Sequence, residues 1–283
     1  MTKLKIISIG DIHGKTYWKE VDPNKYDKIV FQGDYVDSYY HKNAEIYANL
    51  LDIIQLKKDY SDKVILLLGN HDIQYMFLDE GFGCSGFRPE MASNLNFLFK
   101  SNKNLFQIAF QIDNFLWTHA GVSTGWYDKN KNVIEKIGEK FSTKNLADTF
   151  NHMLWLKENK ILHQVGSCRG GAYSFGGITW ADRRETSTDY PEGFHQIVGH
   201  TPIDEITKYG DEKGSIRYID VLGRVAFLEE EAKKIEKKWG KNTAYDDTIR
   251  ALYPDIAANI PDFFESDEKK PEIQMTKFYE FEI

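Results

Sequence analysis

Short apolar runs that end at a glycine-containing turn recur along much of this chain. The run at 28–32 is mostly apolar and β-branched, which predicts a buried strand, and Gly33 and Asp34 follow it directly. Four more runs are followed in the same way by Asp, Asn or His, and they lie at 4–9, 64–68, 115–118 and 196–198. Because α/β proteins bind ligands at the carboxyl ends of their strands, the pattern predicts that five strands deliver polar side chains to one edge of one sheet.

Helical spacing separates some of these strands. Between 43 and 60 apolar residues recur three or four positions apart, at Ile46, Leu50, Leu51 and Ile54. A strand, a helix and a strand in this order predict a βαβ unit with parallel strands. Pro89 suits the first position of a further helix, which we expect over 89–100.

One hairpin and two further strands are expected in the later part of the chain. Asp113-Asn114 separates a run at 105–112 from the run at 115–118, which favours a tight turn between two paired strands. Two further runs, at 216–221 and 224–228, are joined through Gly223.

The last part of the chain differs in character. A charged helix is expected at 229–239, and apolar residues that alternate up to Ile283 suggest a terminal strand. We therefore expect an α/β catalytic domain over 1–228 and a C-terminal appendage over 229–283.

Composition excludes several classes of function. The net charge of −7 argues against nucleic acid as a partner. The two cysteines form no CxxC pair and cannot build a disulfide framework. No run approaches the length of about 18 apolar residues that suggests a membrane span. Met1 leads almost directly into the first strand, so we expect no signal peptide and a cytoplasmic protein.

The polar side chains at the strand ends are good metal ligands. They are Asp11, His13, Asp34, Asn70, His119 and His200. This set is too large for one tetrahedral zinc ion and suits two divalent ions that share a carboxylate. Asp34 follows the strand expected at the middle of the sheet, so it is the candidate bridge. Such ions lower the pKa of bound water and would supply hydroxide as the nucleophile.

Five sequence blocks together resemble a known family. In chain order they are GDIHG, GDYVD, GNHD, THAG and GHTP. They resemble the calcineurin-like metallophosphoesterases, and most nearly the phosphoprotein phosphatases and the symmetrical dinucleoside-tetraphosphatases. The resemblance covers the expected catalytic domain and implies a four-layer α/β/β/α sandwich, in which two facing sheets are flanked by helices.

The resemblance also implies roles for individual residues. One ion would be held by Asp11, His13 and Asp34, and the other by Asp34, Asn70, His119 and His200. Manganese, iron and zinc all suit imidazole with carboxylate. His71 matches the histidine that protonates the leaving oxygen, and Asp37 matches the carboxylate that orients it. A carboxylate beside an imidazole favours the imidazolium form, which is a usable acid.

One position departs from the family pattern. The phosphatase branch usually has GDxxDRG, in which the arginine binds the substrate phosphate, whereas Ser38 follows Asp37 here. A serine cannot donate a charged bidentate pair. Arg169, Arg183 and Arg184 are therefore candidates for replacement contacts to phosphate.

Four functions remain open from the sequence. The favoured one is hydrolysis of phosphomonoesters, in a phosphoprotein or a small phosphoester, by in-line attack of metal-bound hydroxide. A dinucleoside polyphosphate hydrolase is the alternative enzyme, favoured by the GNHD and GHTP variants. A nucleic-acid phosphodiesterase is the third, and the acidic balance of the chain offers it no obvious basic track. The rival from another class is a non-catalytic scaffold with this fold, and the presence of every expected ligand and of His71 argues against it.

Overall fold

Two five-stranded sheets form the centre of the computed structural model, which describes residues 3–226 and 276–283. Sheet A contains β1 (Lys5–Ile9), β2 (Lys28–Phe31), β3 (Val64–Leu67), β4 (Phe106–Gln107) and β10 (Tyr279–Glu282). Sheet B contains β5 (Ala109–Ile112), β6 (Phe115–Thr118), β7 (His195–Val198), β8 (Thr207–Gly210) and β9 (Ser215–Tyr218). The strand orders are β10-β1-β2-β3-β4 and β5-β6-β7-β9-β8, so β2 lies at the middle of sheet A as expected.

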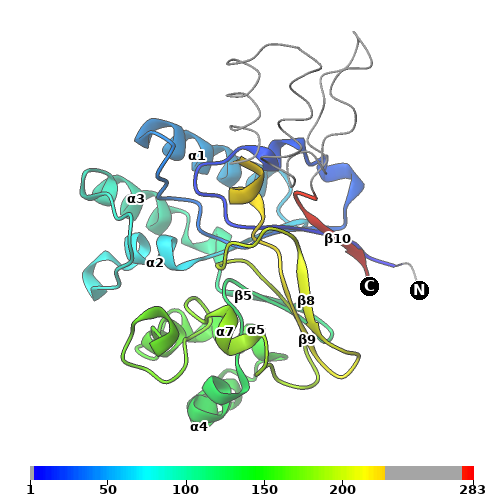
Figure 1. The fold of residues 1–283 in the computed structure, drawn as a ribbon. Coiled ribbons are helices and arrows are strands. Elements are labelled where there is room, and N and C mark those ends of the chain that lie inside the picture. The colour runs from blue at the N-terminus through cyan, green and yellow to red at the C-terminus, as the bar shows by residue number, and fades with distance from the viewer. Residues whose placement is uncertain (1–2, 227–275) are drawn as a thin grey trace, which may run out of the picture.

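Helices gather in two groups beside the sheets (Figure 1). The first group contains α1 (Asn43–Asp59), α2 (Asn70–Met76) and α3 (Pro89–Ser101). The second group contains α4 (Thr124–Phe141), α5 (Leu146–Met153), α6 (Asn159–Leu162) and α7 (Arg183–Thr186). Short 3-10 helices lie at Tyr17–Glu20, Pro23–Lys25, Leu78–Glu80, Lys103–Leu105 and Ser167–Arg169. In the described part of the chain, no helix is both long and apolar enough to cross a membrane.

Alternation along the strands explains why the two sheets face each other. Ile6 and Val30 of sheet A share one apolar cluster with Trp117 and Ile197 of sheet B. Their neighbours in sequence point to the opposite faces, where Ile7, Ile29 and Leu116 pack with helical residues such as Leu50 and Phe150. Successive strand residues point to opposite faces, so each sheet buries one face against the other sheet and one against helices. The expected α/β sandwich is confirmed.

The expectation of one sheet edge was wrong. Of the five strands that end in polar residues, β1, β2 and β3 belong to sheet A, whereas β6 and β7 belong to sheet B. The run at 105–112 is also not one strand. Its first part, β4, pairs with β3, and its second part, β5, pairs with β6 across the expected hairpin. The amide of Ile108, between the two strands, donates to Asn151 Oδ1, so the chain leaves one sheet and enters the other there.

The strand expected at 224–228 was wrong over the residues that the structure describes. Residues 222–226 are helical, and the Val225 amide donates to the Val221 carbonyl. Val221, Leu222 and Val225 are all buried, and this spacing places them on one helical face. The antiparallel partner of β9 is instead β8, which precedes it. The helix expected at 229–239 lies outside the described residues.

The C-terminal strand belongs to sheet A. β10 pairs antiparallel with β1, and Phe281 lies opposite Ile6. The last residues of the chain therefore complete a sheet that begins with the first strand, while a domain boundary at 228 stays a prediction.

A buried histidine makes stability depend on pH. His163 Nδ1 lies 2.9 Å from Thr179 Oγ1, and its Nε2 is buried without a hydrogen-bond partner. Burial lowers the pKa of His163 to about 3. The unfolded chain therefore binds this proton near pH 6.5 and the folded chain does not, so stability is full above that pH and falls below it.

We expect this histidine to cost about 2 kcal/mol of unfolding free energy on going from neutral pH to pH 5. His163→Asn can keep the bond to Thr179 and does not titrate, so its loss over this range should be smaller by that amount. Urea unfolding of both proteins at the two pH values measures the difference. Equal losses in the two proteins would show that His163 is not the titrating group.

Candidate active site

The loops after β1, β2, β3, β6 and β7 bring the residues expected at the strand ends together, although the strands come from two sheets. Ligand atoms of His13, Asp34 and His71 lie within 4.8 Å of one another. The same holds for Asp34, His119 and His200. Asp34, at the end of the central strand of sheet A, therefore belongs to both groups.

Two histidines are oriented by backbone carbonyls. His119 Nδ1 lies 2.7 Å from the Gln32 carbonyl, which can only accept, so Nδ1 carries the proton. In the neutral ring, Nε2 then presents a lone pair, and it lies 3.0 Å from Asn70 Oδ1, 3.1 Å from His200 Nδ1 and 3.3 Å from Asp34 Oδ2. A backbone carbonyl that binds one ring nitrogen is the usual arrangement behind a metal-binding histidine.

His13 is held in the same way. Its Nδ1 lies 2.9 Å from the Val36 carbonyl and 2.8 Å from the Asp37 carbonyl, so Nδ1 is again the donor. Nε2 faces Asp34 Oδ2 at 3.7 Å. Imidazole nitrogens from both sheets thus converge on one carboxylate.

The electrostatics of this cluster call for a cation. Burial lowers the pKa of His119, but the charges of Asp34 and Asp11 outweigh it and raise the pKa to about 9. Burial, and then the charges of His119 and Arg169, lower the pKa of His200 well below its usual range, and its Nε2 is buried without a partner. Lone pairs of nitrogen and oxygen that face each other need a proton or a metal ion between them. The donor set fits divalent cations of the Mn, Fe or Zn type.

The backbone is strained at the site. Among the described residues six non-glycine residues have positive φ, and four of these are His13 (43°), Asp34 (52°), Asp37 (57°) and His200 (63°). Left-handed conformations cost energy in residues with a Cβ and concentrate at functional sites.

Two glycines give the carboxylates room. A Cβ on Gly69 would lie 2.1 Å from Asp34 Oδ1, and a Cβ on Gly199 would lie 2.3 Å from Asp11 Oδ1. The His200 amide, next to Gly199, donates to both Asp11 oxygens at 2.9 and 3.1 Å. The glycines of GNHD and GHTP therefore allow a carboxylate from another strand end to pack directly on the backbone.

His71 forms a pair with Asp37. Its Nδ1 lies 2.9 Å from Asp37 Oδ2, and Asp37 also accepts bonds from Gln74 Nε2 at 2.6 Å and the Tyr75 hydroxyl at 2.5 Å. Burial opposes the charge on His71, but Asp34 and the bond to Asp37 raise its pKa to about 12. The ring is therefore held as an imidazolium in which Asp37 binds Nδ1–H, and Nε2–H makes no bond to Asp37.

The three candidate arginines lie in different surroundings. Arg169 donates to Thr201 Oγ1 at 2.8 Å, next to His200, and its Nε lies 2.7 Å from Asp182. Arg184 pairs with the same carboxylate at 2.8 Å, but its side chain is 69% exposed. Arg183 lies over the rings of Tyr209 and Tyr218 in sheet B. Of the three, Arg169 is the one whose charge acts on His200.

Sequence reasoning gave no role to Asp72, the last residue of GNHD. Its carboxylate accepts from the amides of Asp34 (2.7 Å), Tyr35 (2.9 Å) and Gly69 (2.9 Å), so it joins the loops after β2 and β3. The sequence did contain a signal for this role: Asp72 is an acidic residue at the third position of a helix that begins after a glycine.

Asp220 was also missed, because it was counted inside the expected strand at 216–221. It follows β9 closely, is 5% exposed and has a buried Oδ1 without a partner. Burial first, and then the charge of Asp11, raise its pKa to about 7, and the charge of Lys15 opposes this. Lys15 Nζ donates to the carbonyls of Asp11 and Ile12 at 3.3 and 3.4 Å. Asp220 thus adds a carboxylate near the end of a strand, β9, that is not among the five expected to supply site residues.

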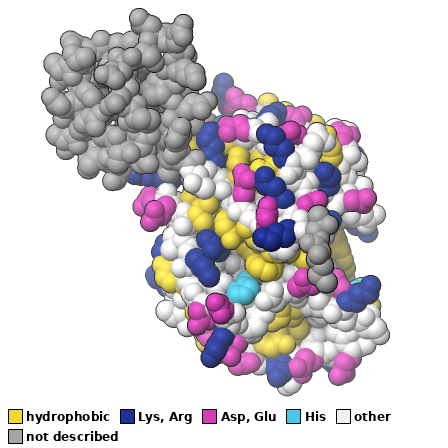
Figure 2. All heavy atoms as spheres, turned by 90° about the vertical axis from the view of Figure 1, so that its right-hand side faces the viewer, with side chains coloured by type: hydrophobic (Ala, Val, Ile, Leu, Met, Phe, Trp, Pro, Cys, Tyr) yellow, Lys and Arg dark blue, Asp and Glu magenta, His cyan; other side chains and the backbone are white. Residues whose placement is uncertain are grey.

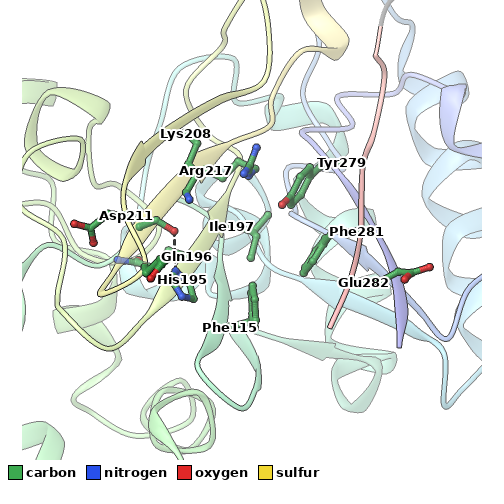
Figure 3. Close-up of a pocket in the computed structure, with 12 residues that line it drawn as sticks. Phe115, His195, Gln196, Ile197, Lys208, Asp211, Arg217, Tyr279, Phe281 and Glu282 are labelled. Atoms are coloured by element: carbon green, nitrogen blue, oxygen red, sulfur yellow. Dashed lines mark hydrogen bonds between the residues drawn. The ribbon is translucent and has the colours of Figure 1, made fainter. Parts of the chain in front are cut away.

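A pocket of about 410 Å³ lies at the opposite ends of the strands (Figure 3). It is lined by Phe115, His195 and Ser215, the first residues of β6, β7 and β9, whereas the site residues follow the last residues of β6 and β7. Tyr279 and Phe281 of β10 line its other wall. This pocket is therefore separate from the candidate active site.

Comparison with solved structures finds phosphatases and metallophosphoesterases with related arrangements. A cold-active protein-tyrosine phosphatase of a psychrophile, Shewanella sp., is 18% identical, with a TM-score of 0.43 over 76% of this chain and 71% of that chain. A serine/threonine phosphatase from Saccharomyces cerevisiae is 19% identical, with a TM-score of 0.43 over 76% and 66%. A metallophosphoesterase from Sphaerobacter thermophilus is 12% identical, with a TM-score of 0.35 over 77% and 76%.

The family model for calcineurin-like phosphoesterases matches residues 4–212. The protein therefore belongs to the calcineurin-like phosphoesterase family, as the order of its five blocks predicts.

Proposed function

We propose that this protein is a phosphomonoesterase that uses two divalent cations, of the phosphoprotein-phosphatase type. The observation that carries the proposal is the position of Asp34 in two groups of ligand atoms, with the His71–Asp37 pair beside it. Two ions that share a carboxylate are the usual arrangement for in-line displacement at phosphorus.

The proposed ligands divide as the family pattern implies. Asp11, His13 and Asp34 would hold one ion, and Asp34, Asn70, His119 and His200 the other. When bound, such ions supply positive charge to the phosphoryl oxygens and lower the pKa of a water nucleophile. Mn, Fe and Zn all accept these donors, and availability decides among them.

The protein's own groups handle the leaving group in this proposal. Asp37 holds one N–H of His71, and the other N–H donates its proton to the leaving oxygen of the ester. Gln74 and Tyr75 keep the Asp37 carboxylate in place through the bonds described above. Asp34 Oδ1 accepts the His71 amide, so both carboxylates are held by hydrogen bonds in the absence of substrate.

A substrate panel tests the proposal. After chelation and reloading with Mn²⁺, we expect p-nitrophenyl phosphate to be hydrolysed faster than bis(p-nitrophenyl) phosphate and diadenosine tetraphosphate. Faster turnover of diadenosine tetraphosphate would favour the dinucleoside polyphosphate hydrolase. Absence of turnover on all three, with both ions bound, would favour a non-catalytic scaffold.

One feature favours that alternative hydrolase. Ser38 and Tyr39 stand where the phosphatase pattern has arginine and glycine, and Tyr40 follows them. The side chains of Tyr39 and Tyr40 are 82% and 84% exposed. Aromatic side chains at the surface can stack on nucleobases.

Long nucleic acids are a poor match for the face of the molecule that Figure 2 shows. Figure 2 shows Lys and Arg side chains interspersed with Asp and Glu over the described part of the face it views. Mixed charges of this kind do not make a basic track for a phosphate backbone.

Arg169 is expected to contact the substrate phosphate. Arg169→Ala should lower kcat/KM by a factor that corresponds to a loss of about 1.5–3 kcal/mol of transition-state stabilisation, because a charge-assisted bond is lost. For the same reason it should weaken inhibition by inorganic phosphate. Arg169→Lys should recover only part, since a point charge cannot reproduce the planar fork of donors. Steady-state kinetics with phosphate as inhibitor measure both.

Arg184→Ala is the matched control for Arg169→Ala. It removes the other partner of Asp182, but Arg184 is more exposed, so a smaller effect is expected. Wild-type kinetics for Ala variants of Arg169, Arg183 and Arg184 alike would contradict replacement of the missing arginine. The position at Ser38 would then mark room for a larger ester group.

A further inference from the structure

A third group of possible ligands lies on the outer side of the His71–Asp37 pair. The thiol of Cys84 joins an Asp37 oxygen and a His71 nitrogen, and the three ligand atoms lie within 4.8 Å of one another. Asp37 is buried, whereas His71 and Cys84 are half-buried, so an ion can reach the group from solvent. Cys84 lies in the glycine-rich loop between α2 and α3, which the proposed reaction does not use.

The loop that carries Cys84 is held by the same side chains that hold Asp37. Gln74 Oε1 accepts from the Cys84 amide at 3.1 Å, while its Nε2 donates to Asp37 at 2.6 Å. The Tyr75 hydroxyl accepts from the Arg88 amide at 2.8 Å and donates to Asp37 at 2.5 Å. Two side chains of α2 thus fix the loop and the carboxylate relative to each other, and this makes the thiol part of a built cluster.

We propose that Asp37, His71 and Cys84 form a third cation site, which binds Zn²⁺ and inhibits the enzyme. Carboxylate, imidazole and thiolate are the three common protein ligands of zinc, and a fourth position can be taken by water. Tetrahedral zinc places such ligand atoms roughly 3.3–3.6 Å apart, a spacing that small side-chain shifts reach from the present one. The soft thiolate selects zinc over magnesium and manganese, which prefer oxygen ligands.

The inhibition rests on the proposed role of His71 as the acid. Zinc binding releases the thiol proton of Cys84 to solvent and removes the Asp37 carboxylate from its pair with His71. If zinc takes Nδ1, the imidazolium loses the proton held by Asp37. If zinc takes the other nitrogen, the donor to the leaving oxygen is gone. In both cases the leaving oxygen is no longer protonated by an imidazolium.

The first experiment measures inhibition of the Mn²⁺-loaded full chain by added Zn²⁺, with phenyl phosphate as substrate, because its leaving oxygen needs a proton. Cys84→Ser should raise the inhibition constant at least about tenfold, since a ligand is lost. Cys168→Ser is the matched control, because Cys168 is the other cysteine of the chain and is also half-buried. It should leave the constant unchanged. Equal inhibition of wild type and Cys84→Ser would overturn the proposal.

The second experiment does not depend on turnover. Co²⁺ replaces Zn²⁺ at such sites, and a thiolate ligand gives a sulfur-to-cobalt charge-transfer band in the near ultraviolet. The band should appear in wild type and in Cys168→Ser and be absent from Cys84→Ser. No band in the wild-type protein would overturn the third site whether or not the variants fold. A band in a protein that hydrolyses none of the esters would instead keep the site and remove the proposed function.

Discussion

Asp34→Asn is expected to abolish phosphoesterase activity and to lower the content of divalent ions. Asp34 Oδ1 accepts the His71 amide at 2.9 Å, and Oδ2 faces His119 at 3.3 Å and His13 at 3.7 Å. Asparagine keeps the shape of the side chain but removes the charge that two cations would share. Because Asp34 is buried, no anion from the solvent can take the place of its carboxylate. Elemental analysis of dialysed protein beside the hydrolysis of p-nitrophenyl phosphate measures both effects.

Two other variants serve as comparisons for Asp34→Asn. Asn70→Ala and His200→Ala each remove a proposed ligand of a single ion, so they should lose about one ion per chain and keep the other. Urea unfolding shows whether any variant has lost its fold. Full activity with two ions per chain in Asp34→Asn would end the assignment of Asp34 as the bridge.

His71→Ala is expected to slow turnover by about 10²–10⁴-fold while both catalytic ions are retained, because it removes a general acid and no ligand of the two proposed catalytic ions. The half-buried ring is held by Asp37 at 2.9 Å, and its centroid lies 4.9 Å from that of His13. The ring is therefore close to the proposed ions but is oriented by a carboxylate that does not belong to them.

Leaving-group dependence distinguishes the acid from a positioning group. p-Nitrophenolate needs little protonation, so the deficit of His71→Ala should be small for p-nitrophenyl phosphate and large for phenyl and alkyl phosphates. The ratio of kcat/KM between variant and wild type is measured across such a series and plotted against the pKa of the leaving group. A loss of equal size for every ester would indicate that His71 binds or positions the phosphate.

Much of the site could be predicted because its signals are local. A strand that ends at a glycine and is followed by Asp, Asn or His can be recognised from a few consecutive residues, as in Gly33-Asp34 and Gly69-Asn70. Backbone conformation at such turns depends mainly on the residues themselves and their neighbours. The order of five such blocks was enough to predict the family and the α/β class.

Other features depend on partners far apart in the chain. Asp220 lies inside an expected strand, and Asp72 ends the GNHD block without an expected role. Only the bond to the Asp34 amide and the charge of Asp11 give these two residues a place at the site. Gln74 likewise gains its position from two bonds, to Asp37 and to the Cys84 amide. Local sequence patterns do not show which residues far apart in the chain will contact each other.

The sequence by itself determined most of the strands (β1, β2, β3, β6, β7, β9 and β10), the helices at 43–60 and 89–100, and the polar residues at the strand ends, but it did not predict β8. Tertiary structure decided that the strands divide between two sheets, that β4 and β5 part at Ile108, and that 222–226 is helical. The physical reason is that a buried apolar run suits either sheet and either kind of element equally well. Packing between Val30 and Trp117, from opposite sheets, selects among these arrangements, and it brings His119 and His200 to Asp34.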